Sequence, residues 1–119
     1  MNDFRLSHIA DDDISSISEW SEEHFGQSAR FRYEALLGAG IDHAAQSRGD
    51  RRFKARPELG AGVISWHLSN STTRSNDGRV NHPRHILFCR WEGDTLAVGR
   101  VLHEVMDPSL HLTTDMDWS

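Results

Sequence analysis

Three histidines and three arginines in the second half of the chain have side chains suited to phosphodiester chemistry. The residues that can exchange a proton near neutral pH are His67, His85 and His103. The residues that can stabilise a phosphate are Arg84, Arg90 and Arg100. Cleavage of RNA by its own 2′-hydroxyl needs a base, an acid and cations on the phosphate. If the chain performs that reaction, we expect His67, His85, Arg100 and His103 to carry it.

The same residues also have ordinary structural interpretations. His103 closes an apolar stretch, and a histidine in that position commonly bonds to neighbouring backbone. Arg90 and Arg100 alternate with apolar neighbours, so each can pair with a nearby carboxylate; the candidates are Glu92, Asp94 and Glu104. These structural interpretations stay open beside the catalytic one.

No metal or cofactor is expected. His82 and His85 lie three positions apart, but no further Cys or carboxylate follows at zinc-site spacing. The Gly60-Ala61-Gly62 turn leads into a strand rather than a helix, unlike a phosphate-binding loop. Cys89 is the only cysteine, so no internal disulfide can form, and we expect it to be buried. With no apolar run of about 20 residues and no signal peptide, the sequence predicts a cytoplasmic protein without membrane contact.

The net charge of −5 conceals a strong asymmetry along the chain. Residues 1–47 carry three basic and nine acidic groups, residues 48–103 carry ten basic and five acidic groups, and residues 104–119 add four acidic groups. A basic middle between acidic ends predicts a surface for an anionic partner, either nucleic acid or an acidic peptide, or else a solvated face of mixed charge.

The first half of the chain has the pattern of a strand followed by two helices. Phe4 and Leu6 alternate with polar residues, and Ser7 is a plausible N-cap. Apolar residues then recur at helical spacing as far as Phe25, where Gly26 predicts a stop. A second stripe, from a cap at Ser28, ends at Ala44. The linker between them is so short that an antiparallel hairpin is expected. Gly38 and Gly40 weaken this second helix unless another segment packs close to them.

The second half predicts three strands. Residues 47–62 are rich in Arg, Gly and Pro and are expected to form a loop, residues 63–69 a strand, and residues 70–83 a long polar loop. Strands are expected at about 84–91 and 95–102. The predicted fold is α+β: an N-terminal strand and a two-helix hairpin packed on one face of a mainly antiparallel four-stranded sheet. The other face is left for solvent or a partner. Residues 1–112 are expected to form one domain, and residues 113–119 a frayed tail.

Several motifs, in this order, resemble the RelE/ParE superfamily of bacterial toxins. They are Phe4-Arg5-Leu6-Ser7, Arg56-Pro57-Glu58-Leu59-Gly60-Ala61-Gly62-Val63, Ser65-Trp66-His67-Leu68, Pro83-Arg84-His85-Ile86-Leu87-Phe88, and Arg100-Val101-Leu102-His103 with Met106-Asp107. The last of these is the most similar to the ParE branch. The resemblance spans almost the whole chain.

The resemblance implies the toxin of a type II toxin–antitoxin pair that poisons DNA gyrase by binding it. It implies no catalysis of its own and no sequence-specific contact with nucleic acid. The partner implied is a ParD-like ribbon-helix-helix antitoxin whose disordered tail folds onto the toxin. We expect target contacts at Arg74, Arg79, Arg84, Arg100, His103 and Met106. We expect antitoxin contacts at Arg90, Trp20 and Ile17, the last two only if they lie outside the core.

Two alternatives remain. The first is a ribosome-dependent mRNA endoribonuclease of the RelE branch, which typically uses clustered Lys and Arg with a late Tyr. This chain has only Lys54, and its only tyrosine, Tyr33, lies on the second predicted helix. A net negative charge also suits a ribosomal RNA surface poorly. The second alternative is a non-toxic or decayed module that only binds its antitoxin.

Overall fold

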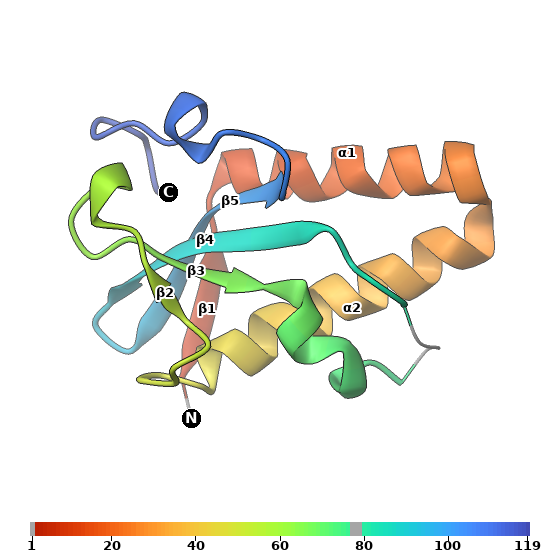
Figure 1. The fold of residues 1–119 in the computed structure, drawn as a ribbon, viewed down its shortest axis with the longest axis horizontal. Coiled ribbons are helices and arrows are strands. Elements are labelled where there is room, and N and C mark those ends of the chain that lie inside the picture. Colours follow the sequence, from red (N-terminus) through yellow and green to blue (C-terminus); the bar gives the residue numbers. More distant parts are fainter. Residues whose placement is uncertain (1, 77–79) are drawn as a thin grey trace.

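The computed structural model describes residues 2–76 and 80–119, and it has two helices and a mixed five-stranded sheet (Figure 1). The helices are α1 (His8–Phe25) and α2 (Gln27–Ala45). The strands are β1 (Asp3–Leu6), β2 (Lys54–Ala55), β3 (Ile64–His67), β4 (His85–Glu92) and β5 (Thr95–His103). The order across the sheet is β1-β5-β4-β3-β2. The predicted α+β class is confirmed.

The helical hairpin begins and turns on two local signals. The Ser7 side chain accepts a hydrogen bond from the Ala10 amide at 2.9 Å, so Ser7 is the N-cap that the sequence predicts. Gly26, at φ +90°, ends α1 and also precedes the first residue of α2. This positive φ suits glycine and lets the chain reverse within one residue. The predicted cap at Ser28 is wrong, because Ser28 already lies inside α2.

The two glycines of α2 have different surroundings. A Cβ on Gly40 would lie 2.6 Å from Cδ2 of Leu68, whereas a Cβ on Gly38 would meet nothing within 4 Å. Leu68 begins a 3₁₀ helix, η2 (Leu68–Arg74), which packs against α2. The expectation that another segment packs close is therefore confirmed for Gly40 alone.

The sheet differs from the prediction in strand number and in direction. β1 pairs with β5 in parallel, and β2 adds a fifth strand inside the expected loop 47–62. Two residues are too few to show the alternation by which strands are recognised in a sequence. The strand predicted over 63–69 ends at His67, because η2 follows directly and takes part of the loop predicted over 70–83.

A bulge in β5 changes which of its residues face the helices. Phe88 pairs with Arg100 and Cys89 pairs with Val98, so Gly99 is an extra residue between them. An extra residue reverses the alternation of side chains along a strand. Leu96 and Val98 therefore face the helices before the bulge, and Val101 faces them after it.

The C-terminal segment covers part of the sheet face opposite the helices. Phe88 and Leu102 on this face pack with Leu112 and Trp118, and Met116 packs against the same cluster. The expectation of a frayed tail at 113–119 is therefore wrong, and the expected open second face holds only beside β2 and β3, where Ser65 and Ile86 line a cavity. Trp118 is 8% exposed, and the Ser119 carbonyl accepts a hydrogen bond from the His8 amide at 2.8 Å. In Figure 1 the C-terminal segment returns to lie beside the start of α1.

The helix face of the sheet holds the larger core. Leu36, Leu37 and Ile41 of α2 pack there against Trp66, and Cys89 is fully buried among them, as expected. Burial raises the pKa of the Cys89 thiol well above its usual range. None of the helices in the described part of the chain is both long and apolar enough to cross a membrane.

Candidate functional site

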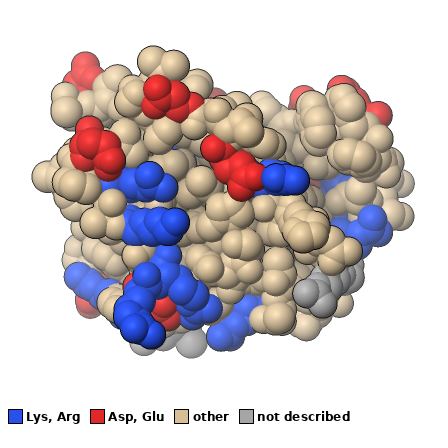
Figure 2. All heavy atoms as spheres, in the orientation of Figure 1, with Lys and Arg blue, Asp and Glu red and all other residues tan. Residues whose placement is uncertain are grey.

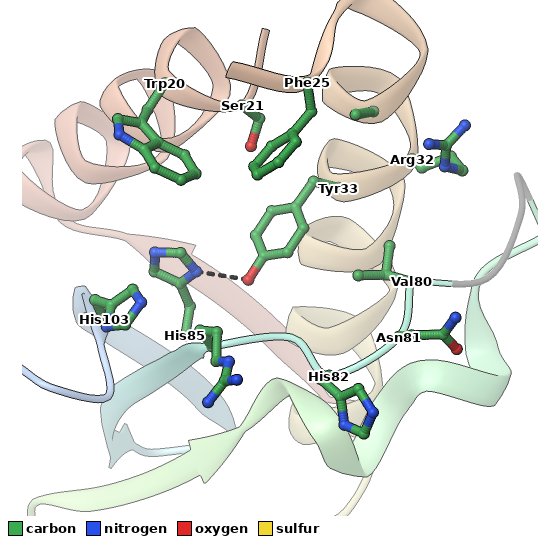
Figure 3. Close-up of a pocket in the computed structure, with 12 residues that line it drawn as sticks. Trp20, Ser21, Phe25, Arg32, Tyr33, Val80, Asn81, His82, His85 and His103 are labelled. Atoms are coloured by element: carbon green, nitrogen blue, oxygen red, sulfur yellow. Dashed lines mark hydrogen bonds between the residues drawn. The ribbon is translucent and has the colours of Figure 1, made fainter. Parts of the chain in front are cut away.

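A cavity of about 480 Å³ lies where the turn of the helical hairpin meets one end of the sheet. Trp20 and Phe25 of α1 and Tyr33 of α2 approach it from the helices, and His85 and His103 from the sheet (Figure 3). The segment 80–82 closes a further side. Trp20 is 52% exposed and Phe25 is 69% exposed, so the helical rim is both aromatic and open.

Tyr33 and His85 are joined at the base of this cavity. The Tyr33 hydroxyl lies 2.5 Å from Nδ1 of His85 (Figure 3). Burial raises the pKa of Tyr33 to about 12, so its hydroxyl stays protonated and can donate a hydrogen bond to the ring nitrogen. Burial, followed by the neighbouring charge of His103, lowers the pKa of His85 to about 4. His85 is therefore neutral at pH 7, and with Nδ1 accepting, its ring proton lies on Nε2.

His103 stands directly opposite His85 on the neighbouring strand. The two residues are cross-strand partners, and their ring centroids are 5.2 Å apart, edge to face. The Val105 amide donates a hydrogen bond to Nδ1 of His103 at 3.2 Å. This bond to nearby backbone is the structural role considered for a strand-end histidine. Because Nδ1 of His103 is engaged in this bond, Nε2 is the ring nitrogen that can contact a ligand.

His67 belongs to a different cluster at the same end of the sheet. Its Nδ1 accepts from the Ser69 amide at 3.1 Å, so its Nε2 carries the proton that goes to Glu104 at 2.8 Å. Arg84 donates to the other oxygen of this carboxylate at 2.8 Å. The hydrogen bonds from Arg84 and then His67 lower the pKa of Glu104 to about 2. Glu104 is therefore a fully charged bridge between β3 and the start of β4.

Arg100 is engaged in a partly buried ion pair. Its Nε and Nη2 donate to the two carboxylate oxygens of Asp13 on α1, each at 2.9 Å, and its Nη1 donates to the His111 carbonyl at 3.0 Å. The side chains of Arg100 and Asp13 are only 16% and 14% exposed. None of the three carboxylates considered from the sequence is the partner. The Arg100 guanidinium therefore has little freedom to reach a ligand.

The proposed nuclease residues are thus close but not assembled. His85 and His103 face the cavity, His67 binds Glu104, and Arg100 binds Asp13. Nδ1 of neutral His85 already accepts from the Tyr33 hydroxyl and its Nε2 carries the ring proton, so the ring can donate a further hydrogen bond but cannot accept one. Arg32 and Arg84 are the cations that line the cavity among the described residues, and the Arg84 side chain is 64% exposed. The cavity can therefore bind a polar or aromatic group, with the Nε2–H of His85 as a hydrogen-bond donor at its base.

No model of a known protein family matches this sequence, and no curated protein is significantly similar to it. Within residues 2–76 and 80–119, no group of three or more His, Cys, Asp or Glu side chains is placed to hold a metal ion.

The other predicted target contacts are scattered. Arg74 is exposed at the end of η2, and Met106 is 46% exposed in the turn after β5. Arg79 lies outside the described residues. Only Arg84 and His103 of the six predicted target contacts line the cavity.

The three predicted antitoxin contacts differ in how accessible they are to a partner. Trp20 is exposed on the cavity rim, whereas Ile17 is partly buried and packs against the core. Arg90 forms an ion pair at 2.9 Å with Glu92, one of the carboxylates considered as its partner from the sequence. Its guanidinium lies 4.4 Å from the Trp118 ring centroid. Trp20 is therefore the one of the three that a partner can reach without displacing a packed side chain.

Sequence reasoning missed two components of this region. Tyr33 has the spacing of a core residue on α2, and nothing local reveals that its hydroxyl reaches His85, 52 positions later. A second cavity, of about 370 Å³, lies beside β2 and is lined by Arg51, Arg52, Lys54 and Arg56. The excess of basic residues in the middle of the chain indicated a cationic surface there. The two-residue strand β2, beside which the cavity lies, has no recognisable pattern in the sequence.

Proposed function

We propose that this chain is the toxin of a type II toxin–antitoxin pair, similar to the ParE branch. It acts in the cytoplasm by binding its target rather than by a reaction of its own. One observation supports binding over catalysis: Arg100 and His67, two of the four residues that a nuclease would need, are held by Asp13 and Glu104. The cavity beside them presents an open aromatic rim instead.

The aromatic rim fits a protein partner. Trp20 stacks on His24 with ring centroids 4.2 Å apart, and Phe25 lies against Trp20 at 5.6 Å. Large aromatic side chains that stay exposed beside a cavity are typical of interaction sites rather than of a solvated surface. The partner that suits the resemblance is a ParD-like ribbon-helix-helix antitoxin, with an apolar side chain of its tail seated against Trp20 and Phe25. The target that the resemblance suggests is DNA gyrase, reached through Arg84, His103 and Met106.

The antitoxin contact is tested with a matched pair of aromatic substitutions. Trp20→Ala removes one of the two exposed rings of the rim, and Phe31→Ala removes a similarly exposed ring (57%) that does not line the cavity. We expect Trp20→Ala to weaken binding of the antitoxin encoded beside this gene at least tenfold, and Phe31→Ala to leave its Kd unchanged. Calorimetry with purified proteins gives the Kd. Equal effects of the two substitutions would exclude the cavity as the antitoxin site.

The toxin proposal itself is tested by induced expression in bacteria that lack the antitoxin. Growth arrest with DNA-damage signalling and intact early translation is expected for a gyrase poison. Normal growth would favour a decayed or purely antitoxin-binding relative and would contradict the proposal.

A ribosome-dependent endoribonuclease is the second candidate, because His85 and His103 lie edge to face on neighbouring strands and line the cavity together with Arg84. It predicts immediate loss of translation and fragmented mRNA. His103→Ala should then abolish cleavage. Arg100→Ala is not a suitable test of this mechanism, since it would leave Asp13 partly buried without its ion-pair partner.

A further inference from the structure

The second cavity, which we call the basic groove, lies on the opposite edge of the sheet from β1. Its cationic residues are Arg51, Arg52, Lys54 and Arg56, and its polar residues include Ser65 and Asn70. No Asp or Glu lines it among the described residues. A concave surface lined by cations and uncharged hydrogen-bonding groups, with no carboxylate, selects for an anion.

The chain around β2 places these cations on one side. Phe53 points inward, where its ring lies 4.7 Å from that of Trp66 and packs on the core. In an extended segment the residues on either side of an inward side chain point outward. Lys54 is the cross-strand partner of Ser65 and lines the groove with it, and Arg56 follows two positions later on the same side. Arg52, in the turn before β2, also lines the groove. Outward residues in such a segment repeat about every 6.7 Å, which is close to the repeat of phosphates along a nucleic-acid strand.

Two of the guanidinium groups are held in position before any ligand arrives. Arg56 donates to the Ser65 hydroxyl at 3.0 Å. Arg52 lies 5.0 Å from the Trp66 ring centroid and binds Asp50 through two nitrogens. Arg51 and Lys54 are exposed and form no ion pair with any described residue. The groove therefore combines fixed guanidinium groups with two cations whose charge is not neutralised by a neighbour.

The charge of the molecule is separated in space as well as in sequence. Figure 2 shows Lys and Arg side chains gathered over the part of the surface where Figure 1 places β2, whereas most of the Asp and Glu of this face lie in its upper half. A net charge of −5 therefore does not prevent an anion from approaching this side.

We propose that the basic groove binds the phosphate backbone of a nucleic acid without reading its sequence. The lining favours this ligand over an acidic peptide. β2 offers only two residues of edge backbone for a peptide strand, and Ile86 is the only apolar residue that lines the groove among those described. A peptide would need pockets for its side chains. No Phe, Tyr or Trp of the described chain lines the groove to stack on bases, so phosphates are the recognised group.

The test measures binding of labelled 20-base-pair DNA and RNA duplexes of equal sequence to the purified chain by fluorescence anisotropy. We expect a Kd on the order of 10 µM at 50 mM salt and a steep loss of affinity with added salt, because bound phosphates release counterions. Similar affinity for both duplexes would identify the shared backbone as the ligand, and tighter binding of one would identify that nucleic acid as the source.

Charge-matched variants locate the contact. Arg51→Gln and Lys54→Gln each remove one groove cation, and Arg32→Gln removes one exposed cation on α2 away from the groove. We expect the Arg51→Gln/Lys54→Gln double variant to weaken binding at least tenfold and to reduce the salt slope by about 2. Each groove variant alone should weaken binding more than Arg32→Gln does. Circular dichroism checks that the variants are folded.

Three outcomes would overturn the inference: no binding of either duplex at 50 mM salt, an equal effect of Arg32→Gln and Arg51→Gln, or binding of polyglutamate with no binding of either duplex. Growth arrest is not part of this readout. A failure to bind either duplex would therefore not contradict the toxin proposal. Normal growth on induced expression would not contradict the basic groove as a binding site.

Discussion

Arg100 and Asp13, 87 positions apart, form a two-point ion pair that fastens α1 to the exposed edge of β5. β1 covers this edge only as far as Val98. Beyond that point the Ser7 hydroxyl donates to the Gly99 carbonyl, and the Asp13 carboxylate also accepts from the Val101 amide at 2.9 Å. The side chains of Ser7 and Asp13 thus provide the hydrogen bonds that a neighbouring strand would otherwise make.

Replacing Asp13 should therefore be costly. Asp13→Ala leaves the Arg100 guanidinium partly buried without a carboxylate, and we expect a loss of about 3 kcal/mol in the free energy of unfolding. Asp94→Ala is the control, because Asp94 is 93% exposed and 3.6 Å from Arg48; we expect it to cost under about 0.5 kcal/mol. Urea denaturation measures both values. Similar losses for the two variants would mean that the pair does not fasten the helix.

His85 should make stability depend on pH below neutrality. Its pKa is about 4 in the folded chain and near 6.5 when unfolded, so the unfolded state binds more protons in this range. Stability is fully present above pH 6.5 and falls as the pH approaches 4, by up to about 3 kcal/mol. His85→Asn keeps an acceptor for Tyr33 but cannot titrate, and its unfolding free energy should change less between pH 7 and pH 4.5. An unchanged pH profile in this variant would exclude His85 as the source.

The two glycines of α2 should respond to alanine in opposite directions. Gly38→Ala adds a methyl group in open space and favours the helix, which should raise stability by about 1 kcal/mol. Gly40→Ala drives a methyl group into Leu68 and should lower stability by about 1–3 kcal/mol. Thermal unfolding of the two variants provides the comparison. A stabilising Gly40→Ala would show that η2 does not pack as closely as described.

The C-terminal segment should lift off the sheet when Gly99 gains a side chain. A Cβ at Gly99 would lie 2.7 Å from both Cε of Met116 and Cζ3 of Trp118. Because the indole ring cannot yield as a methionine can, we expect Gly99→Ala to move the Trp118 emission to longer wavelength and to cost about 1–3 kcal/mol. Comparison with Gly99→Ala/Trp118→Phe isolates the Trp118 signal from the other tryptophans. An unshifted Trp118 spectrum would contradict this packing.

The strongly periodic or capped parts of the fold could be predicted from the sequence. Ser7, Gly26 and the apolar stripes define the hairpin, and alternating residues define β4 and β5. Other features depend on contacts across the chain. The two-residue β2 has no period, and Trp118 gives no sign in its polar surroundings that Gly99 leaves room for its ring.

The candidate site shows the same division between local and distant signals. Arg84 and His103 were predicted and do line the cavity. Arg100 was predicted as a contact, but the carboxylate that holds it lies on α1, and no local rule pairs residues 87 positions apart. The Tyr33–His85 bond was missed for the same reason.

The parallel pairing of β1 with β5 has a consequence for how the chain folds. It joins Asp3 to Thr95, and the Ser7–Gly99 bond beside it spans 92 positions. Contacts this distant in sequence must pay the entropy of closing a long loop before they stabilise anything. The helical hairpin and the β4–β5 hairpin are local and can form early. We therefore expect β1 to dock last, and its docking, rather than helix formation, to set the folding rate.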